Sequence, residues 1–460
     1  MSDTAHLLRD LQAGGINRRA FVTRALALGA SFSAIDIMLQ ACGGGGSGGA
    51  ASSTTPIKWS TWAGAQSAKR FQAFTDKYNA DHKTNVKFLA IPSYDEYLPK
   101  ILAELNAGIA PDVFYAADEH IIKLIKNQTI AELTPLLTGS SSQIKQDDYF
   151  PGLWGAAKTH SGKLYGIPVD CNPLVVWYNK KVLAQAGISE MPADLYAQGQ
   201  WTRDAFQEML NKLQAVKKTG YVLDNDSMMY HYSWVLNNGG QIYDNDGYGN
   251  FVANQDAKSI EIFQWLADNV RAKKITYGAT LPSNQGVDLM FMANQVGFLT
   301  EGRYYLSEFK DARSRGLDYD IAPIPSNAGK GGIAGVFLAY IVMNKKTKNP
   351  DAAYQFLSNY VYKDGEILRL KDDGNAVPSV KGADQVVLDG SDPMHAQYLL
   401  DARNNGFATF ASEMGTPGLS ADIVSAFDQV FLKGADVQAT LDKVAMMVNP
   451  RIKEAQSLLQ

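Results

Sequence analysis

The chain has 460 residues, which is too many for one ordinary hydrophobic core, so two lobes or domains are expected. Hydrophobic residues make up 46% and charged residues 20% of the chain, as in an ordinary globular protein. The net charge of −4 leaves no surplus of basic side chains to bind phosphate backbones, which excludes a nucleic-acid-binding protein.

Residues 1–41 have the features of an export signal. Arg18 and Arg19 precede an apolar run over residues 25–39, the order found in twin-arginine signals, and the run is too short and too polar to span a membrane as a helix. The run ends in Leu-Gln-Ala-Cys, which resembles the bacterial lipobox. This pattern predicts cleavage before Cys42 and lipidation of that cysteine.

Residues 42–55 are rich in Gly and Ser and are predicted to form a flexible linker. The chain has two cysteines. If Cys42 carries lipid, Cys171 has no partner, so packed cores rather than disulfides must stabilise the fold.

Strands and helices are predicted to alternate after the linker. Apolar and β-branched runs predict strands over residues 57–62, 86–91 and 111–115, and apolar residues at helical spacing predict a helix between each pair. This order is typical of right-handed βαβ units with a parallel sheet.

Three side chains follow these strands directly. In open α/β sheets, ligands bind beyond the carboxyl ends of the strands. Trp62, Asp118 and Glu119 each lie just past a predicted strand. They are therefore expected to face a cleft.

A long extended segment over residues 162–178 is the central feature of the chain. Pro168 and Pro173 each hold the preceding residue extended, and the β-branched and aromatic residues after Pro173 predict a buried strand. Asn179 is then predicted to cap a short helix over residues 180–186.

Residues 179–271 are predicted to be mainly helical. The tetrapeptide Asp-Asn-Asp-Gly at residues 244–247 lacks the spacing and the distant Glu of a calcium loop, so a β-turn is predicted there. Two amphipathic helices over residues 421–432 and 437–447 are expected to pack on the second lobe. The histidines show no metal-ligand spacing, and no phosphate-binding loop is found, so neither a metal nor a nucleotide is expected.

Several motifs resemble those of the bacterial extracellular solute-binding proteins of the sugar ABC-transporter type, the family of the maltose-binding protein. The clearest are Gly-Lys-Leu-Tyr-Gly-Ile-Pro at residues 162–168, Trp-Tyr-Asn-Lys-Lys at 177–181 and the Ala-Pro-Asp-Val segment within 107–115. Further similarities occur at residues 57–62, 234–247, 291–305, 319–325, 332–341 and 349–357, and the resemblance is weaker beyond about residue 390. The segment 291–305 departs from the family pattern, with Asn294 for a glycine and Tyr304-Tyr305 for a tryptophan.

The resemblance implies a type II periplasmic-binding-protein fold, with two α/β lobes around a ligand cleft. It assigns residues 56–168 and 299–345 to the N-terminal lobe and residues 169–298 and 346–460 to the C-terminal lobe. The segment after residue 168 is then expected to cross between the lobes and to line the cleft.

The same resemblance suggests the residues that bind the ligand. Sugars present apolar C–H faces ringed by hydroxyl groups, so their sites need aromatic platforms and planar hydrogen-bonding groups. Trp59, Trp177 and Trp265 are assigned to the core because their segments are apolar throughout. The predicted ligand-binding residues are Trp62, Asp118, Glu119, Asp170, Asn172, Trp234, Glu301, Arg303, Tyr304, Tyr305, Gly335 and Phe337.

The predicted function is that of a monomeric, lipid-anchored, extracytoplasmic protein without a cofactor, which captures a carbohydrate and delivers it to the permease of an ABC importer. A polyol or glycerol-phosphate ligand is the first alternative, although Arg303 is the single obvious cation at the predicted cleft. A secreted glycoside hydrolase is the second, because Asp and Glu beside aromatic platforms would also suit hydrolysis.

Overall fold

The computed structural model describes residues 56–457, apart from residues 141, 160, 283–285, 329–330, 373, 391 and 417. The predicted export signal, the linker and Cys42 lie outside these residues. Both sheets belong to one compact unit, Thr55–Gln460.

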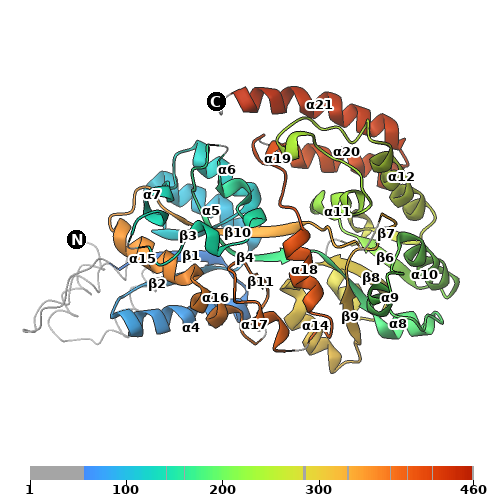
Figure 1. Cartoon of the computed structure of the whole chain (residues 1–460), viewed down its shortest axis with the longest axis horizontal. Coiled ribbons are helices and arrows are strands. Elements are labelled where there is room, and N and C mark those ends of the chain that lie inside the picture. The colour runs from blue at the N-terminus through green and yellow to red at the C-terminus, as the bar shows by residue number, and fades with distance from the viewer. Residues whose placement is uncertain are drawn as a thin grey trace, which may run out of the picture. The chain divides into compact units, whose positions relative to one another are not determined.

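The first sheet has six strands (Figure 1). They are β1 (Lys58–Trp62), β2 (Lys87–Ile91), β3 (Val113–Ala117), β4 (Ile167–Pro173), β10 (Val336–Met343) and β11 (Val377–Pro378). Their order is β11-β4-β10-β3-β1-β2. β1 pairs in parallel with β2 and β3, which confirms the predicted parallel arrangement, whereas β10 runs antiparallel to β3 and β4.

The second sheet has five strands. They are β5 (Val175–Asn179), β6 (Thr219–Leu223), β7 (Ile275–Tyr277), β8 (Val296–Glu301) and β9 (Tyr319–Ala322). Their order is β7-β6-β8-β5-β9, with β6 parallel to β7 and β8, and β5 antiparallel to β8 and β9.

Helices enclose both sheets (Figure 1). The core around the first sheet includes side chains of α4 (Ala65–His82), α5 (Tyr94–Ala107), α6 (Asp118–Lys126), α7 (Thr134–Leu137), α13 (Val287–Met292), α14 (Leu306–Arg313), α15 (Pro350–Val361), α16 (Lys363–Leu370), α17 (Gln385–Leu388), α18 (Gln397–Asn405) and α19 (Ala411–Met414). The core around the second includes side chains of α8 (Lys180–Gln185), α9 (Pro192–Ala197), α10 (Arg203–Ala215), α11 (Met229–Asn237), α12 (Ala257–Arg271), α20 (Leu419–Lys433) and α21 (Val437–Ser457). Short 3₁₀ turns are η1 (Gln146–Asp148), η2 (Pro151–Leu153), η3 (Gly155–Ala157), η4 (Asn245–Gly247), η5 (Gly278–Thr280) and η6 (Arg303–Tyr305). α20 and α21 pack against α12, as predicted for the last two helices.

Local sequence signals explain where several helices begin and end. The Asn179 side chain accepts a hydrogen bond of 3.0 Å from the Val182 amide and so caps α8, as predicted. Gly108 ends α5 at φ 70°, and Gly434 separates α20 from α21 at φ 71°. Both glycines adopt the left-handed conformation that side chains with a Cβ rarely take.

The sheets divide the chain differently from the predicted lobe boundaries. β8 and β9 belong to the second sheet because they flank β5, although residues 299–345 were assigned to the first lobe. α15 and α16 pack in the first core, although residues 346–460 were assigned to the second lobe. The chain crosses from the first sheet to the second at Leu174, and it returns between β9 and β10.

Candidate functional site

A cavity of about 990 Å³, called the cleft below, is lined by residues that belong to both sheets and to the C-terminal helices. A smaller cavity of about 490 Å³ lies between α4, α14 and α16 and contains none of the predicted site residues. The cleft is lined by nine of the twelve predicted residues: Trp62, Asp118, Glu119, Asp170, Asn172, Glu301, Tyr304, Tyr305 and Phe337.

Strand ends explain the first part of the cleft. Trp62 is the last residue of β1, and Asp118 and Glu119 are the first two residues of α6, directly after β3. Because β1 and β3 are parallel neighbours, their carboxyl ends share one edge of the sheet. The three side chains therefore line the same cavity.

Asp118 is the most deeply buried of these three residues, with 3% of its surface exposed. Its Oδ1 atom accepts a hydrogen bond of 2.8 Å from the Tyr340 hydroxyl, whereas its Oδ2 atom forms no hydrogen bond of ordinary geometry among the described residues. The Thr409 hydroxyl and the Ala156 amide nevertheless lie close enough to lower the pKa of the carboxyl. Burial raises the pKa of the Asp118 carboxyl to about 6, and the Tyr340 hydrogen bond opposes this rise. The site therefore presents a buried acceptor that a ligand could use.

Trp62 presents a partly exposed indole held by other rings. The ring centroids of Tyr94, Tyr97 and Tyr115 lie 5.1, 5.2 and 5.4 Å from that of Trp62, all in edge-to-face contact. The Tyr94 hydroxyl in turn donates to the Glu119 carboxylate. Such supported aromatic faces suit the C–H faces of a sugar ring.

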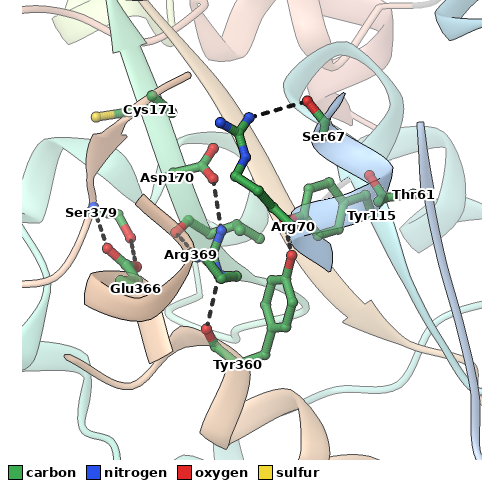
Figure 2. A network of polar contacts seen from close by, with 12 residues as sticks. Thr61, Ser67, Arg70, Tyr115, Asp170, Cys171, Tyr360, Glu366, Arg369 and Ser379 are labelled. Carbon is green, nitrogen blue, oxygen red and sulfur yellow. Dashed lines mark hydrogen bonds and ion pairs between the residues drawn. The ribbon is translucent and has the colours of Figure 1, made fainter. Parts of the chain in front are cut away.

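Asp170 is held from behind by a buried arginine (Figure 2). The Arg369 Nη1 atom lies 3.1 Å from Asp170 Oδ2, and its Nη2 atom donates to the Val169 carbonyl at 3.0 Å. Burial raises the pKa of Asp170, while the charges of Arg369 and Arg70 oppose that rise. The Asp170 side chain thus lines the cleft with one oxygen tied to Arg369.

The surrounding contacts in Figure 2 fix that arginine. The Arg369 guanidinium lies 4.2 Å from the centre of the Tyr360 ring, and the Tyr360 hydroxyl is 2.7 Å from that of Tyr115, a residue of the cleft wall. Glu366 lies on α16, as Arg369 does, and its carboxylate accepts hydrogen bonds from the Ser379 hydroxyl and amide. The Ser379 Oγ atom also lies 2.9 Å from the Pro168 carbonyl oxygen, so α16 and Ser379 hold β4 from one side.

Glu301 ends β8 on the opposite side of the cleft and is 2% exposed. Its Oε2 atom accepts hydrogen bonds from the hydroxyls of Tyr230 and Tyr304. Burial, together with the nearby charges of Asp224 and Asp226, raises the pKa of Glu301 well above its ordinary value.

Three further carboxylates line this side. Asp224 follows β6, and burial together with the Asp226 charge raises its pKa to about 6. Glu413 accepts hydrogen bonds from the hydroxyls of Tyr243 (2.8 Å) and Ser420 (3.0 Å), and burial raises its pKa. Asp428 accepts from the Tyr277 hydroxyl at 2.7 Å.

Three predicted residues do not line the cleft. Trp234 is 0% exposed, and its indole donates to the Tyr221 hydroxyl within the second core, which contradicts its prediction as a stacking platform. Arg303 is 2% exposed and donates to the Ala376 carbonyl at 2.9 Å. Gly335 packs against α11, where its amide donates to the Ser233 hydroxyl at 2.8 Å.

The sequence reasoning missed several lining residues: Tyr94, Tyr115, Asp224, Asp226, Ser227, Tyr230, Asn375, Thr409, Glu413 and Asp428. Asp224 follows a strand, so the rule that selected Asp118 could have found it. Glu413 and Asp428 lie on the C-terminal helices α19 and α20. No local sequence pattern indicates that these helices approach the cleft.

Within the described parts of residues 56–457, no group of three or more His, Cys, Asp or Glu side chains is arranged to hold a metal ion. None of the helices searched there is both long and apolar enough to cross a membrane.

Comparison with known proteins agrees with this geometry. The model of the bacterial extracellular solute-binding protein family matches residues 64–366. The chain belongs to this family. A maltodextrin-binding protein of Bacillus subtilis is 23% identical over 322 residues, which cover 67% of this chain and 70% of the relative. A maltooligosaccharide ABC transporter solute-binding lipoprotein of Streptococcus pneumoniae is 24% identical over 296 residues, covering 61% and 63%.

Solved structures share the fold of this family member. An ABC substrate-binding protein of Listeria monocytogenes, solved in complex with cycloalternan, superposes with a TM-score of 0.74 at 20% identity, covering 87% of this chain and 99% of its own. This similarity confirms the predicted type II two-lobed fold.

Proposed function

We propose that this family member captures a carbohydrate in the cleft and delivers it to the permease of an ABC importer. The observation that carries the proposal is the combination of supported aromatic side chains, such as Trp62 and Tyr304, with carboxylates from both sheets in one cavity. Aromatic faces bind sugar C–H groups, and carboxylates accept hydrogen bonds from pairs of hydroxyls. The names of the maltodextrin- and maltooligosaccharide-binding relatives support the same ligand class.

The charge of the cleft argues against a glycerol-phosphate ligand. Among the described residues that line it there is no Lys, Arg or His. A phosphate group needs several donors, preferably cationic, and would lie among carboxylates here. The single cation considered from the sequence, Arg303, does not line the cleft.

The lipid anchor and the lobe assignment also belong to this proposal. Acylation of Cys42 would tether the protein outside the cytoplasmic membrane, close to the permease. The Cys42→Ser variant should then leave the membrane fraction of cells, whereas equal retention would contradict anchoring. The sheets and cores support two lobes between which the chain passes at Leu174, between β9 and β10, and again between α19 and α20.

A thermal-shift screen tests the proposed function. A ligand that binds the native chain at 100 times its dissociation constant stabilises it by about 2.7 kcal/mol, so a true ligand should raise the melting temperature by roughly 3 to 5 °C. The Cys42→Ser chain would be screened against mono- and oligosaccharides, with glycerol 3-phosphate as a comparison. If no sugar shifts the melt, the carbohydrate proposal fails. New reducing ends from an oligosaccharide would instead indicate a glycoside hydrolase.

A further inference from the structure

The described residues that line the cleft include many acidic side chains and no basic ones. The described residues that line it include carboxylates from both sheets and from the C-terminal helices but no basic side chain: the acids are Asp118, Glu119, Asp170, Asp224, Asp226, Glu301, Glu413 and Asp428. Within the described residues, Asp170 alone among these acids forms an ion pair with an Arg or Lys, namely Arg369, and Glu119 lies 3.6 Å from the His120 ring. A cationic ligand would therefore meet carboxyl groups that, apart from Asp170, have no Arg or Lys ion-pair partner among the described residues.

Asp118 adds an independent observation. The Thr409 hydroxyl and the Ala156 amide lie close enough to lower the pKa of this carboxyl, but its Oδ2 atom is buried and forms no hydrogen bond of ordinary geometry among the described residues. An unsatisfied buried carboxylate oxygen is costly, and a charged donor satisfies it more strongly than a neutral hydroxyl does. The position therefore favours a cationic donor on the ligand.

The rings beside these acids fit the same ligand. Trp62 and Tyr94 lie near Asp118 and Glu119, and Tyr230 and Tyr304 donate to Glu301. A protonated amine is attracted to the face of an aromatic ring as well as to carboxylates. A neutral sugar would use the hydrogen-bonding capacity of the site but, unlike an ammonium group, would not stabilise the ionised forms of Asp118 and Glu301, whose pKa values burial raises.

We propose that the preferred ligand is an aminated carbohydrate, with its protonated amino group bound at the Asp118 side of the cleft. This inference rests on the proposed carbohydrate function and specifies the class of sugar.

The affinity for an aminated ligand should change with pH in a different direction from the affinity for a neutral sugar. The groups that face Asp118 are Glu119 on its own helix, Tyr340 on β10 and Thr409, and those that face Glu301 are Asp224, Asp226, Tyr230 and Tyr304. Burial raises the pKa values of Asp118 and Asp224 to about 6, so part of this charge is lost below that pH. An ammonium ligand should bind more tightly as the pH rises from about 5.5 to about 7, whereas a neutral sugar should bind equally well or less tightly.

Calorimetric titration of matched sugar pairs tests the proposal. The pairs would be glucosamine and glucose, galactosamine and galactose, and the β-1,4 glucosamine tetramer and cellotetraose, each at about pH 6.5. For every skeleton that binds, the amino member should bind about tenfold more tightly or better, as expected for a charge-assisted in place of a neutral hydrogen bond.

The variants locate the effect. Asp118→Asn should reduce the tenfold preference to about threefold or less, and Glu119→Gln, on the exposed side, should reduce it partly. Glu208→Gln, an exposed residue of α10, is the control that should leave the ratio unchanged.

Two outcomes would overturn the inference alone: a neutral member that binds as tightly as its amino partner, or an Asp118→Asn variant that keeps the full preference. Binding of no sugar from any pair or from the wider panel would instead overturn the proposed function, and this inference with it.

Discussion

At the scale of single residues, Trp62 and Trp234 are both predicted from the sequence to bind the ligand, but only Trp62 lines the cleft, whereas Trp234 is buried in the second core. Trp62 ends a strand at the edge of the sheet, so its ring remains partly exposed at the cleft. Trp234 lies in α11, where almost every position is buried and no polar face distinguishes cleft from core. A motif position alone could not separate the two.

Alanine variants should separate the two tryptophans experimentally. Trp234→Ala leaves a large hole among Phe206, Tyr221 and Trp265 and should lower the free energy of unfolding by about 3 to 5 kcal/mol, with little change in sugar affinity for the folded fraction. Trp62→Ala should instead weaken binding by about 2 kcal/mol or more, as loss of a hot-spot aromatic does. Urea unfolding and calorimetry would measure both. A Trp234→Ala protein with normal stability and lost binding would contradict this assignment.

Asp118 should destabilise the free protein at neutral pH. Burial raises its pKa from the ordinary Asp value of 3.8 to about 6, so between these two pH values the folded state binds more protons than the unfolded state and stability falls as pH rises. Asp118→Asn removes the buried charge. The variant should match the wild type at about pH 4 and exceed its free energy of unfolding by roughly 1 to 3 kcal/mol at about pH 7. Glu208→Gln is the control, and a difference that does not change with pH would argue against the buried charge.

At the scale of elements, α16 and β4 are joined by the buried contacts of Arg369 with Asp170 and Val169. Removing one partner of a buried ion pair leaves the other charge uncompensated. Arg369→Gln should therefore cost about 3 to 5 kcal/mol of stability and also weaken sugar binding, because Asp170 loses its support at the cleft.

Arg271→Gln is the matched control for that variant. Arg271 pairs with Asp268 at 2.9 Å on the exposed side of α12, where such pairs are worth less than about 1 kcal/mol. Urea unfolding of the two variants in parallel would measure the difference. Equal, small effects would mean that α16 does not hold β4 through this ion pair.

The hydrophobic pattern of the sequence predicted where strands and helices lie better than it predicted which strands pair with one another. The parallel β1, β2 and β3 and the Asn179 cap followed from local patterns, because strand and cap signals act over a few residues. The place of β8 and β9 in the second sheet did not, because pairing with β5 joins segments more than 100 residues apart. The same limit hid Glu413 and Asp428, which reach the cleft through the packing of the last helices.

At the scale of the whole described unit, few segments join the two sheets. β10 pairs with β4 from Ile167 to Pro173 and β11 pairs with Asp170 and Cys171, so the expected crossing segment is a hydrogen-bonded strand up to Pro173. The crossing itself is Leu174, whose amide donates to the Gly335 carbonyl at 2.9 Å. Gly335, predicted as a ligand contact, thus joins the crossing at Leu174 to the segment that returns to the first sheet at β10.

Ligand-driven closure about this crossing is the last prediction. A sugar that contacts Asp118 on one side and Glu301 on the other gains its full set of contacts only when the two sides approach, so its higher affinity for the closed state shifts the population toward closure. An ammonium group should strengthen the shift, because closure brings carboxylates of both sides together and a bound cation offsets their repulsion. Small-angle scattering should therefore show a smaller radius of gyration with the best ligand of the screen, and no change with a sugar that does not bind. An unchanged radius at saturating ligand would mean that the cleft binds its sugar without closing, in which case the crossing at Leu174 serves as a fixed connection rather than a hinge.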